Sequence, residues 1–160
     1  MRDSNRSPDA ACVALFAEVI NKRLPAALVD PEVKQQMILK SGGVLRELIR
    51  IVDLCCDRCM QELRGRIRRE VFDKSPVIID QAVLDTVLTD LQISYAEPLG
   101  QVDFELLKLI YERFKPQDVE NQRFLDLLHG LYVLEYRNAV LWYDLNPIVF
   151  DLLVQEGVLA

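Results

Sequence analysis

Apolar side chains recur at intervals of three and four residues through most of the first hundred positions, which is the period of an amphipathic helix. The pattern predicts helices over about residues 10–24, 31–40, 44–68 and 79–95. Asp30 and Pro31 supply a helix cap and a proline suited to the first helical position. The third helix is the longest, and we expect it to be the spine of its domain.

Turn signals separate these helices from those that follow. Asp73-Lys74-Ser75-Pro76 lies between the third and fourth helices, and Pro98-Leu99-Gly100 breaks the fourth. Helical spacing then returns over about residues 102–114 and again, more briefly, over residues 119–129, before Gly130.

The period changes to that of strands near the end of the chain. Residues 131–137 and 140–144 are rich in β-branched and aromatic side chains, and Asn138-Ala139 between them suits a turn, so a β-hairpin is expected. Asn146-Pro147 then caps a last helix that ends near Gly157. The aromatic residues expected to pack the hairpin onto the helices are Tyr132, Tyr136 and Trp142.

These elements predict a mainly α fold in two domains. A loose tail covers residues 1–9, a helical bundle covers residues 10–98, and a smaller module covers residues 99–160. The order helix, helix and two-stranded hairpin in the second domain is typical of a winged-helix-like module. Because an isolated hairpin is marginally stable, it must pack on the helices.

Composition excludes several classes of protein. The chain has 160 residues, 51% of them hydrophobic and 28% charged, which is typical of a folded protein. Its net charge of -6 argues against a broad nucleic-acid surface. No apolar run is long enough to span a membrane and no signal peptide is evident, so we expect a soluble, cytoplasmic protein without a membrane partner.

One local cluster departs from the acidic average. Arg64, Arg66, Arg68 and Arg69 lie within six positions at the end of the third helix. A solvated helix end whose cations complement the helix dipole explains them. A contact with nucleic acid or with a protein partner is the alternative.

No catalytic or metal site can be assembled from the sequence. Cys55, Cys56 and Cys59 lie within one helical pattern, and His129 is the only histidine, so we expect small buried thiols and no metal. A single histidine also leaves no catalytic set of the serine, histidine and aspartate type. The chain alone is therefore not expected to be an enzyme.

The start of the third helix carries a resemblance. Residues 41–50 read SGGVLRELIR, so that Gly42 and Gly43 precede a helix with Arg46 in its first turn. This resembles the helix start in the C-terminal lid of AAA+ and related signal-transducing P-loop ATPases. The resemblance implies that Arg46 is the sensor 2 arginine, which reaches the γ-phosphate of ATP held by the core, with Gly42 and Gly43 beside it.

The end of the chain extends the resemblance. The segments VLEYRN, from Val133, and WYDLNP, from Trp142, look like the terminal wing and closing helix of prokaryotic ATPases of this kind. They are similar in plan to replication-initiator ATPases that carry a lid and a winged helix. The resemblance thus spans about residues 10–158.

The loop that binds ATP phosphates in these families, Gly-x-x-x-x-Gly-Lys-Ser/Thr, does not occur in the chain. We therefore expect a regulatory lid and winged-helix module that acts with a P-loop ATPase core, either as part of a longer chain or as a separate relative. No cofactor is expected to bind this chain alone, and ATP and Mg²⁺ are implied for the parent ATPase. A further protein partner is expected to receive the signal.

Two other functions stay open. A winged-helix regulator could bind DNA directly, although residues 117–138 are net acidic and favour a wing that contacts protein. A plain helical scaffold is the other, in which Arg46 is an ordinary surface residue. Apart from a sensing role, Arg46 could also pair with a neighbour such as Glu47 or Glu18.

Overall fold

The structure is a computed structural model of the chain, and it describes residues 7–69, 75–138 and 140–159. The described part is mainly helical with one antiparallel hairpin, which confirms the fold class expected from the sequence. The chain divides into two compact units, residues 8–89 and residues 90–160. The division falls inside a helix, whereas the sequence places a domain boundary at Pro98-Leu99-Gly100, and that boundary stays a prediction.

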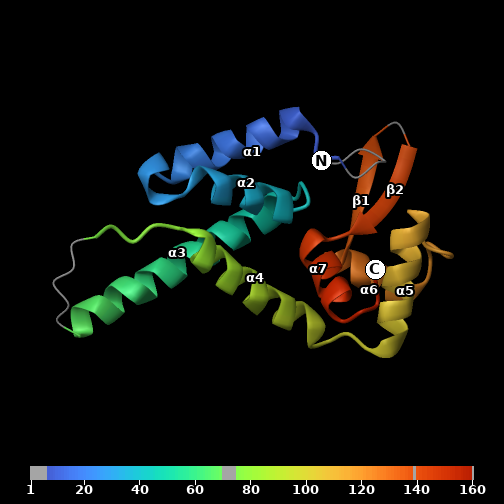
Figure 1. Cartoon of the computed structure of the whole chain (residues 1–160). Coiled ribbons are helices and arrows are strands. Elements are labelled where there is room, and N and C mark those ends of the chain that lie inside the picture. Colours follow the sequence, from blue (N-terminus) through green and yellow to red (C-terminus); the bar gives the residue numbers. More distant parts are fainter. Residues whose placement is uncertain (1–6, 70–74, 139, 160) are drawn as a thin grey trace. The chain divides into compact units, whose positions relative to one another are not determined.

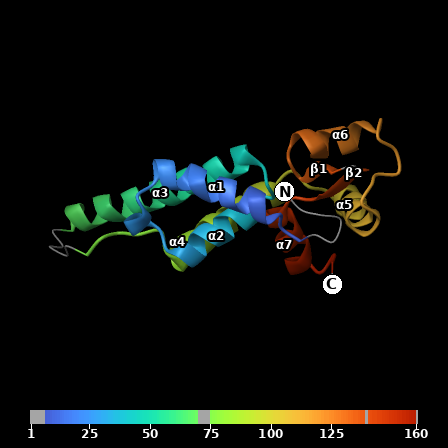
Figure 2. The same cartoon turned by 90° about the horizontal axis from the view of Figure 1, so that it is seen from above.

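The first unit is helical throughout its regular structure. It contains α1 (Ala10–Arg23), a short 3-10 helix η1 (Ala26–Leu28), α2 (Pro31–Lys40), α3 (Leu45–Arg68) and the first part of α4 (Gln81–Ala96). α1 and α2 lie side by side and cover the first half of α3, and the last turns of α3 extend beyond both of them (Figures 1 and 2).

Aspartate caps determine where three of these helices begin. The side chains of Asp9, Asp30 and Asp80 each accept a hydrogen bond from a backbone amide in the first turn that follows. α4 therefore begins after Asp80, later than the apolar pattern indicated. Ile79 instead forms a parallel bridge with Val29, which the sequence analysis did not anticipate.

Residues 75–80, which lead into α4, lie along α3 (Figures 1 and 2). Arg66 Nη1 donates to the carbonyl oxygen of Ser75 at 3.0 Å, and the Cys59 thiol lies 3.6 Å from the carbonyl oxygen of Ile78. The expected turn at residues 73–76 begins outside the described residues, as do most of the expected N-terminal tail and the C-terminal residue.

The core of this unit forms where the inner face of α3 meets its neighbours. α3 contributes every third or fourth side chain to it, which is the spacing of one helix face. The most deeply buried side chains are those of Val33, Met37, Leu48, Ile51, Cys55 and Leu84.

The second unit combines three helices with the hairpin. It contains α5 (Gln101–Arg113), α6 (Gln122–His129), β1 (Val133–Asn138), β2 (Val140–Leu145) and α7 (Pro147–Gln155), together with the last turns of α4. The two strands pair antiparallel, and α5 packs on β2 while α6 packs on β1. The expected turn at Asn138-Ala139 falls partly on residue 139, which lies outside the described residues.

Two boundaries in this unit differ from the sequence prediction. α6 begins at Gln122, after the expected start at residue 119, because the side chain of Asn121 caps it by accepting the Phe124 amide. β1 begins at Val133, after the expected start at residue 131, because Leu131 has a φ of 60°. That left-handed conformation is incompatible with a strand.

Aromatic side chains fix the hairpin to the helices, as the sequence predicts. Tyr136 stacks on Trp142 across the strand pair with ring centroids 4.5 Å apart, and Trp142 meets Phe114 edge to face at 5.8 Å. Tyr132 packs edge to face on Tyr95 of α4 at 5.0 Å. These are preferred geometries for aromatic pairs, so the hairpin is held by specific contacts and not by burial alone.

Candidate nucleotide-sensing site

The turn between α2 and α3 has a conformation that requires its glycines. Gly42 and Gly43 have φ values of 63° and 81°, in the left-handed region that other residues adopt at a cost. Ser41 is fully buried, and its hydroxyl donates to the Ile38 carbonyl at 2.6 Å and accepts from the Gly43 amide at 3.3 Å. The turn that leads into α3 is therefore held firmly in place.

Arg46 lies in the first turn of α3, directly after this turn, and its side chain is exposed. Within the part of the chain that the structure describes, its guanidinium forms no ion pair or hydrogen bond. Glu47, which the scaffold interpretation offers as its partner, is only 3% exposed and pairs with Arg50 at 3.7 Å. Glu47 is therefore not the partner of Arg46, and an exposed Arg46 without an ion pair agrees with both the sensing and the scaffold interpretations.

The backbone at this helix end is also open. Val44 occupies the capping position of α3, and no side chain among the described residues caps the helix there. The amides of the first helical turn lack partners within the helix, and they carry the positive end of the helix dipole. Arg46 adds a positive charge at that end, in the same turn as the buried carboxylate of Glu47. The exposed guanidinium and the uncapped amides can contact an anion without enclosing it.

The arginine cluster at the other end of α3 does not form one surface. Arg66 Nη2 lies 2.6 Å from Glu62 Oε1, and its guanidinium also holds the Ser75 carbonyl. Arg64, Arg68 and Arg69 are exposed. Arg64 and Arg68 lie one turn apart on the same side of the helix, whereas Arg66 and Arg69 lie on other sides because successive residues are rotated by about 100°.

Two arginines of the second unit are paired with carboxylates, whereas Lys108, Arg113 and Lys115 are exposed and form no ion pair with a described residue. Arg123 forms a two-bond ion pair with Asp103, at 2.5 and 2.6 Å, and Arg137 pairs with Glu135 at 2.7 Å. The hairpin exposes apolar side chains on β2, since Val140 is 70% and Leu141 is 49% exposed. A surface of this kind suits a protein contact better than a phosphate backbone.

Cys55 and Cys59 are buried, as the sequence indicates, whereas Cys56 is half-buried. Burial raises the pKa of the Cys55 thiol to about 12, with the neighbouring thiols as a smaller cause, and burial raises the pKa of Cys56 and Cys59 as well. The described residues contain no group of three or more side chains placed to hold a metal ion.

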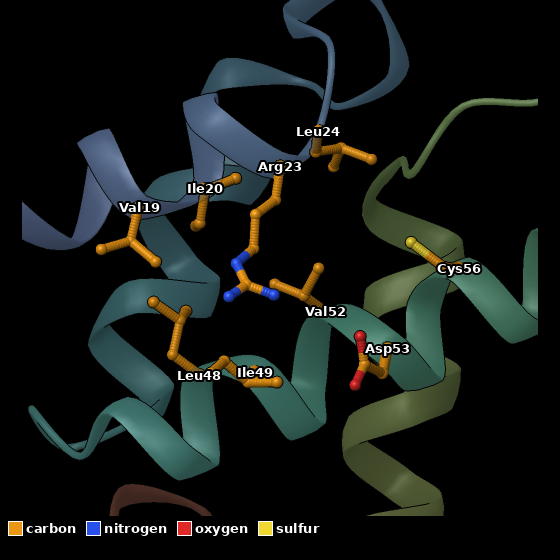
Figure 3. Close-up of a pocket in the computed structure, with 9 residues that line it drawn as sticks. All are labelled: Val19, Ile20, Arg23, Leu24, Leu48, Ile49, Val52, Asp53 and Cys56. Atoms are coloured by element: carbon orange, nitrogen blue, oxygen red, sulfur yellow. The ribbon is translucent and has the colours of Figure 1, made fainter.

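A groove between α1 and α3 was not anticipated from the sequence. It has a volume of about 330 Å³. Figure 3 shows Arg23 of α1 reaching across it toward Val52 of α3, with Asp53 at its edge. The helical pattern of the third helix contains the signal, because Ile49, Val52 and Cys56 lie beside its core face rather than on it. The groove is lined by Val19, Ile20, Arg23, Leu24, Leu48, Ile49, Val52, Asp53 and Cys56.

Comparisons with protein families, with curated proteins and with solved structures found no match to this chain. Among the described helices, none combines the length and the apolar character needed to cross a bilayer. The assignment of a function therefore depends on the residues and their geometry.

Proposed function

We propose that the chain is the lid and winged-helix portion of a nucleotide-driven switch, in which Arg46 senses the phosphates of ATP bound by a P-loop core. The observation that carries this proposal is the exposed Arg46 guanidinium, which has no carboxylate partner among the described residues and lies at the positive end of α3. A cation is disfavoured at that end of a helix unless an anion stabilises it. The γ-phosphate is such an anion.

The separate roles of this chain and of the ATPase core follow from the groups that this chain contributes. It supplies one guanidinium and an open helix end, whereas holding ATP and Mg²⁺ takes a phosphate-binding loop and acidic ligands. These belong to the core, either in the same longer chain or in a separate subunit. Arg46 then stabilises the charge that develops on the transferred phosphate, a contribution that cationic side chains make in phosphoryl transfer. The chain itself is not the enzyme.

The second unit transmits the nucleotide state to a protein partner. Two of its arginines, Arg123 and Arg137, are paired with carboxylates, and its wing exposes Val140 and Leu141. Such a surface favours an apolar protein contact over DNA. The rigid turn at Gly42 and Gly43 ties the position of Arg46 to that of α2.

The proposal is tested by comparing Arg46→Ala with Arg58→Ala in the presence of the ATPase core. The core is the P-loop protein encoded in the same reading frame, or the P-loop protein that co-purifies with this chain. Arg58 is a matched control because it is an exposed arginine in the middle of the same helix. We expect Arg46→Ala to lower ATP turnover by about tenfold or more while ATP affinity changes much less. Arg58→Ala should leave turnover unchanged.

Two results would contradict the proposal. One is the absence of a P-loop core both from the reading frame and among the proteins that bind the chain. The other is equal ATP turnover in the Arg46→Ala and Arg58→Ala variants. Partial rescue by Arg46→Lys would show that the charge, rather than the shape of the side chain, is what the site uses.

A further inference from the structure

The second half of α3 carries an apolar face that no other described element covers. Met60, Leu63 and Ile67 are 47%, 37% and 76% exposed. Together with the half-buried Cys56 they follow spacings of four, three and four residues, so they lie on one side of the helix. We call these four residues the α3 stripe. A continuous exposed apolar surface of this kind marks an interaction site.

The α3 stripe is continuous with the groove between α1 and α3. Cys56 belongs to both, and Val52 continues the same helical row toward the start of α3. Over that first half of the helix, α1 is the element that lies across the row (Figure 3). An amphipathic helix therefore already covers one half of this row, and the other half has the same character.

Charged side chains along one flank of the stripe indicate which partner covers the stripe. Asp53 and Asp57 lie on this flank toward the start of α3, and Arg64 and Arg68 lie on it toward the end. All four are exposed, and none forms an ion pair with a residue that the structure describes. Arg23 reaches toward Asp53 across the groove but forms no ion pair with it.

These four charges are arranged symmetrically about the point between Met60 and Gln61. If a second α3 lies antiparallel on the first and is centred there, Asp53 faces Arg68 of the other copy. Asp57 likewise faces Arg64 of the other copy. In a two-fold symmetric pair of antiparallel helices, each flank meets the same flank of the partner helix. Each aspartate of this flank therefore faces an arginine of the other copy, and each ion pair occurs twice in the dimer. Opposite charges beside an apolar seam are what sets helix orientation in coiled coils.

We propose that the α3 stripe is the contact surface of an antiparallel homodimer, with the two-fold axis passing between Met60 and Gln61. Met60 of each copy packs close to the axis. Ile67 of one copy reaches the groove beside Val52 and Cys56 of the other, and the groove is large enough for a branched aliphatic side chain. The dimer contact involves no nucleotide, so a test of the dimer does not depend on the proposed role of Arg46.

The charge arrangement allows a swap experiment that tests the geometry. The dimer dissociation constant is measured by analytical ultracentrifugation of the full chain without nucleotide. Asp57→Arg and Arg64→Asp each place like charges opposite one another, and each should weaken the dimer by roughly three- to tenfold. The double variant Asp57→Arg/Arg64→Asp restores both pairs, so its dissociation constant should return to that of the unaltered chain.

Apolar variants test the seam itself. Met60→Glu and Ile67→Glu should give monomers, because each brings a carboxylate into the apolar contact of both copies. Val102→Glu is the matched control, since Val102 is 72% exposed on α5 and lies outside the stripe. It should leave the dimer intact, and circular dichroism should show all variants to be folded.

A monomeric unaltered chain at the highest soluble concentration would overturn the proposal. So would a dimer that survives Met60→Glu, because the contact would then lie elsewhere. Failure of the double charge variant to restore the dissociation constant would overturn the antiparallel arrangement.

Discussion

Asp103 and Arg123 form the strongest side-chain tie in the second unit. The carboxylate of Asp103 accepts two hydrogen bonds from Arg123 and a third from the Gly100 amide at 2.7 Å, so it joins α5 to α6 and also caps α5. Asp103 is 4% exposed, which means that it depends on these partners. Removing Arg123 leaves a buried carboxylate with only its backbone donor.

We therefore expect Arg123→Ala to lower the free energy of unfolding by about 1–2 kcal/mol, a value reduced by the partial exposure of the arginine. Urea denaturation followed by circular dichroism measures it. Arg113→Ala removes an exposed arginine from the end of α5 and should change stability by less than about 0.5 kcal/mol. Equal effects of the two substitutions would show that the ion pair contributes nothing.

The same ion pair predicts a dependence on acid. The hydrogen bonds from Arg123 lower the pKa of Asp103 below its ordinary value of 3.8. The unfolded chain therefore takes up the proton first as pH falls. The stabilising contribution is complete above about pH 4 and is lost as the pH falls through the lower folded pKa. Asp103→Asn should flatten this part of the curve of stability against pH, and an unchanged curve would refute the assignment.

Cys55 should react only slowly with thiol reagents in the folded chain. Burial raises its pKa from 9.0 to about 12, which lowers its thiolate fraction near pH 8 by about a thousandfold. Labelling with a thiol reagent at that pH, read by mass spectrometry after digestion, should therefore modify Cys55 far more slowly than in urea. Cys12 in α1 serves as the internal comparison, and equal labelling of the two would contradict the buried environment of Cys55.

At the scale of residues, the sequence identified charges but not their partners. The net acidic segment 117–138 contains Arg123, yet the carboxylate that pairs with Arg123 lies on α5, and no local pattern links the two helices. Glu47 shows the opposite case, because its neighbour Arg46 is adjacent in sequence but turned away. Helical rotation separates neighbours by about 100°, so adjacency along the chain is a poor guide to pairing.

At the scale of elements, two glycines with helical φ values should respond to alanine in opposite ways. A Cβ at Gly65, in the last turns of α3, would meet no atom within 4 Å, whereas a Cβ at Gly130 would lie 2.7 Å from the ring of Tyr132. That ring cannot move freely because it packs on Tyr95. The surroundings therefore differ although both residues are glycine.

We expect Gly65→Ala to raise the free energy of unfolding by about 0.5–1 kcal/mol, since alanine restricts the unfolded chain and favours helix. Gly130→Ala should lower it by about 1 kcal/mol or more through crowding. Thermal and urea unfolding of both variants check the pair. The crowding at Tyr132 would be refuted if Gly130→Ala were as stable as the unaltered chain.

The elements themselves were largely predictable because their signals are local. Asp30 and Pro31 predict the start of α2, and the strand-like composition on either side of residue 139 predicts the hairpin. The predicted boundaries were wrong where a side-chain cap or a left-handed backbone conformation moved the start of an element by two or three residues. Asn121 caps α6 later than the apolar pattern indicates, and Leu131 takes a left-handed conformation ahead of β1.

At the scale of the whole molecule, the mainly α class follows from periodicity, but the grouping into two units does not. The division inside α4 depends on which side chains meet across long stretches of sequence, and Tyr95 shows this by packing on Tyr132. The groove between α1 and α3 could not be predicted from the sequence for the same reason. Residues at the edges of the two apolar helix faces line it, and a sequence pattern gives only the centre of each apolar face.

The length of α3 bears on how many nucleotides a complete assembly takes up. α3 has 24 residues and rises about 1.5 Å per residue, which places Arg46 roughly 20 Å from the centre of the stripe. In the antiparallel pair the two copies of Arg46 stand at opposite ends of a rod, about 40 Å apart. A single ATP molecule is far too short to bridge them. If both proposals hold, each dimer recruits two ATPase cores, one at each end, and saturates at two nucleotides rather than at one shared between its halves.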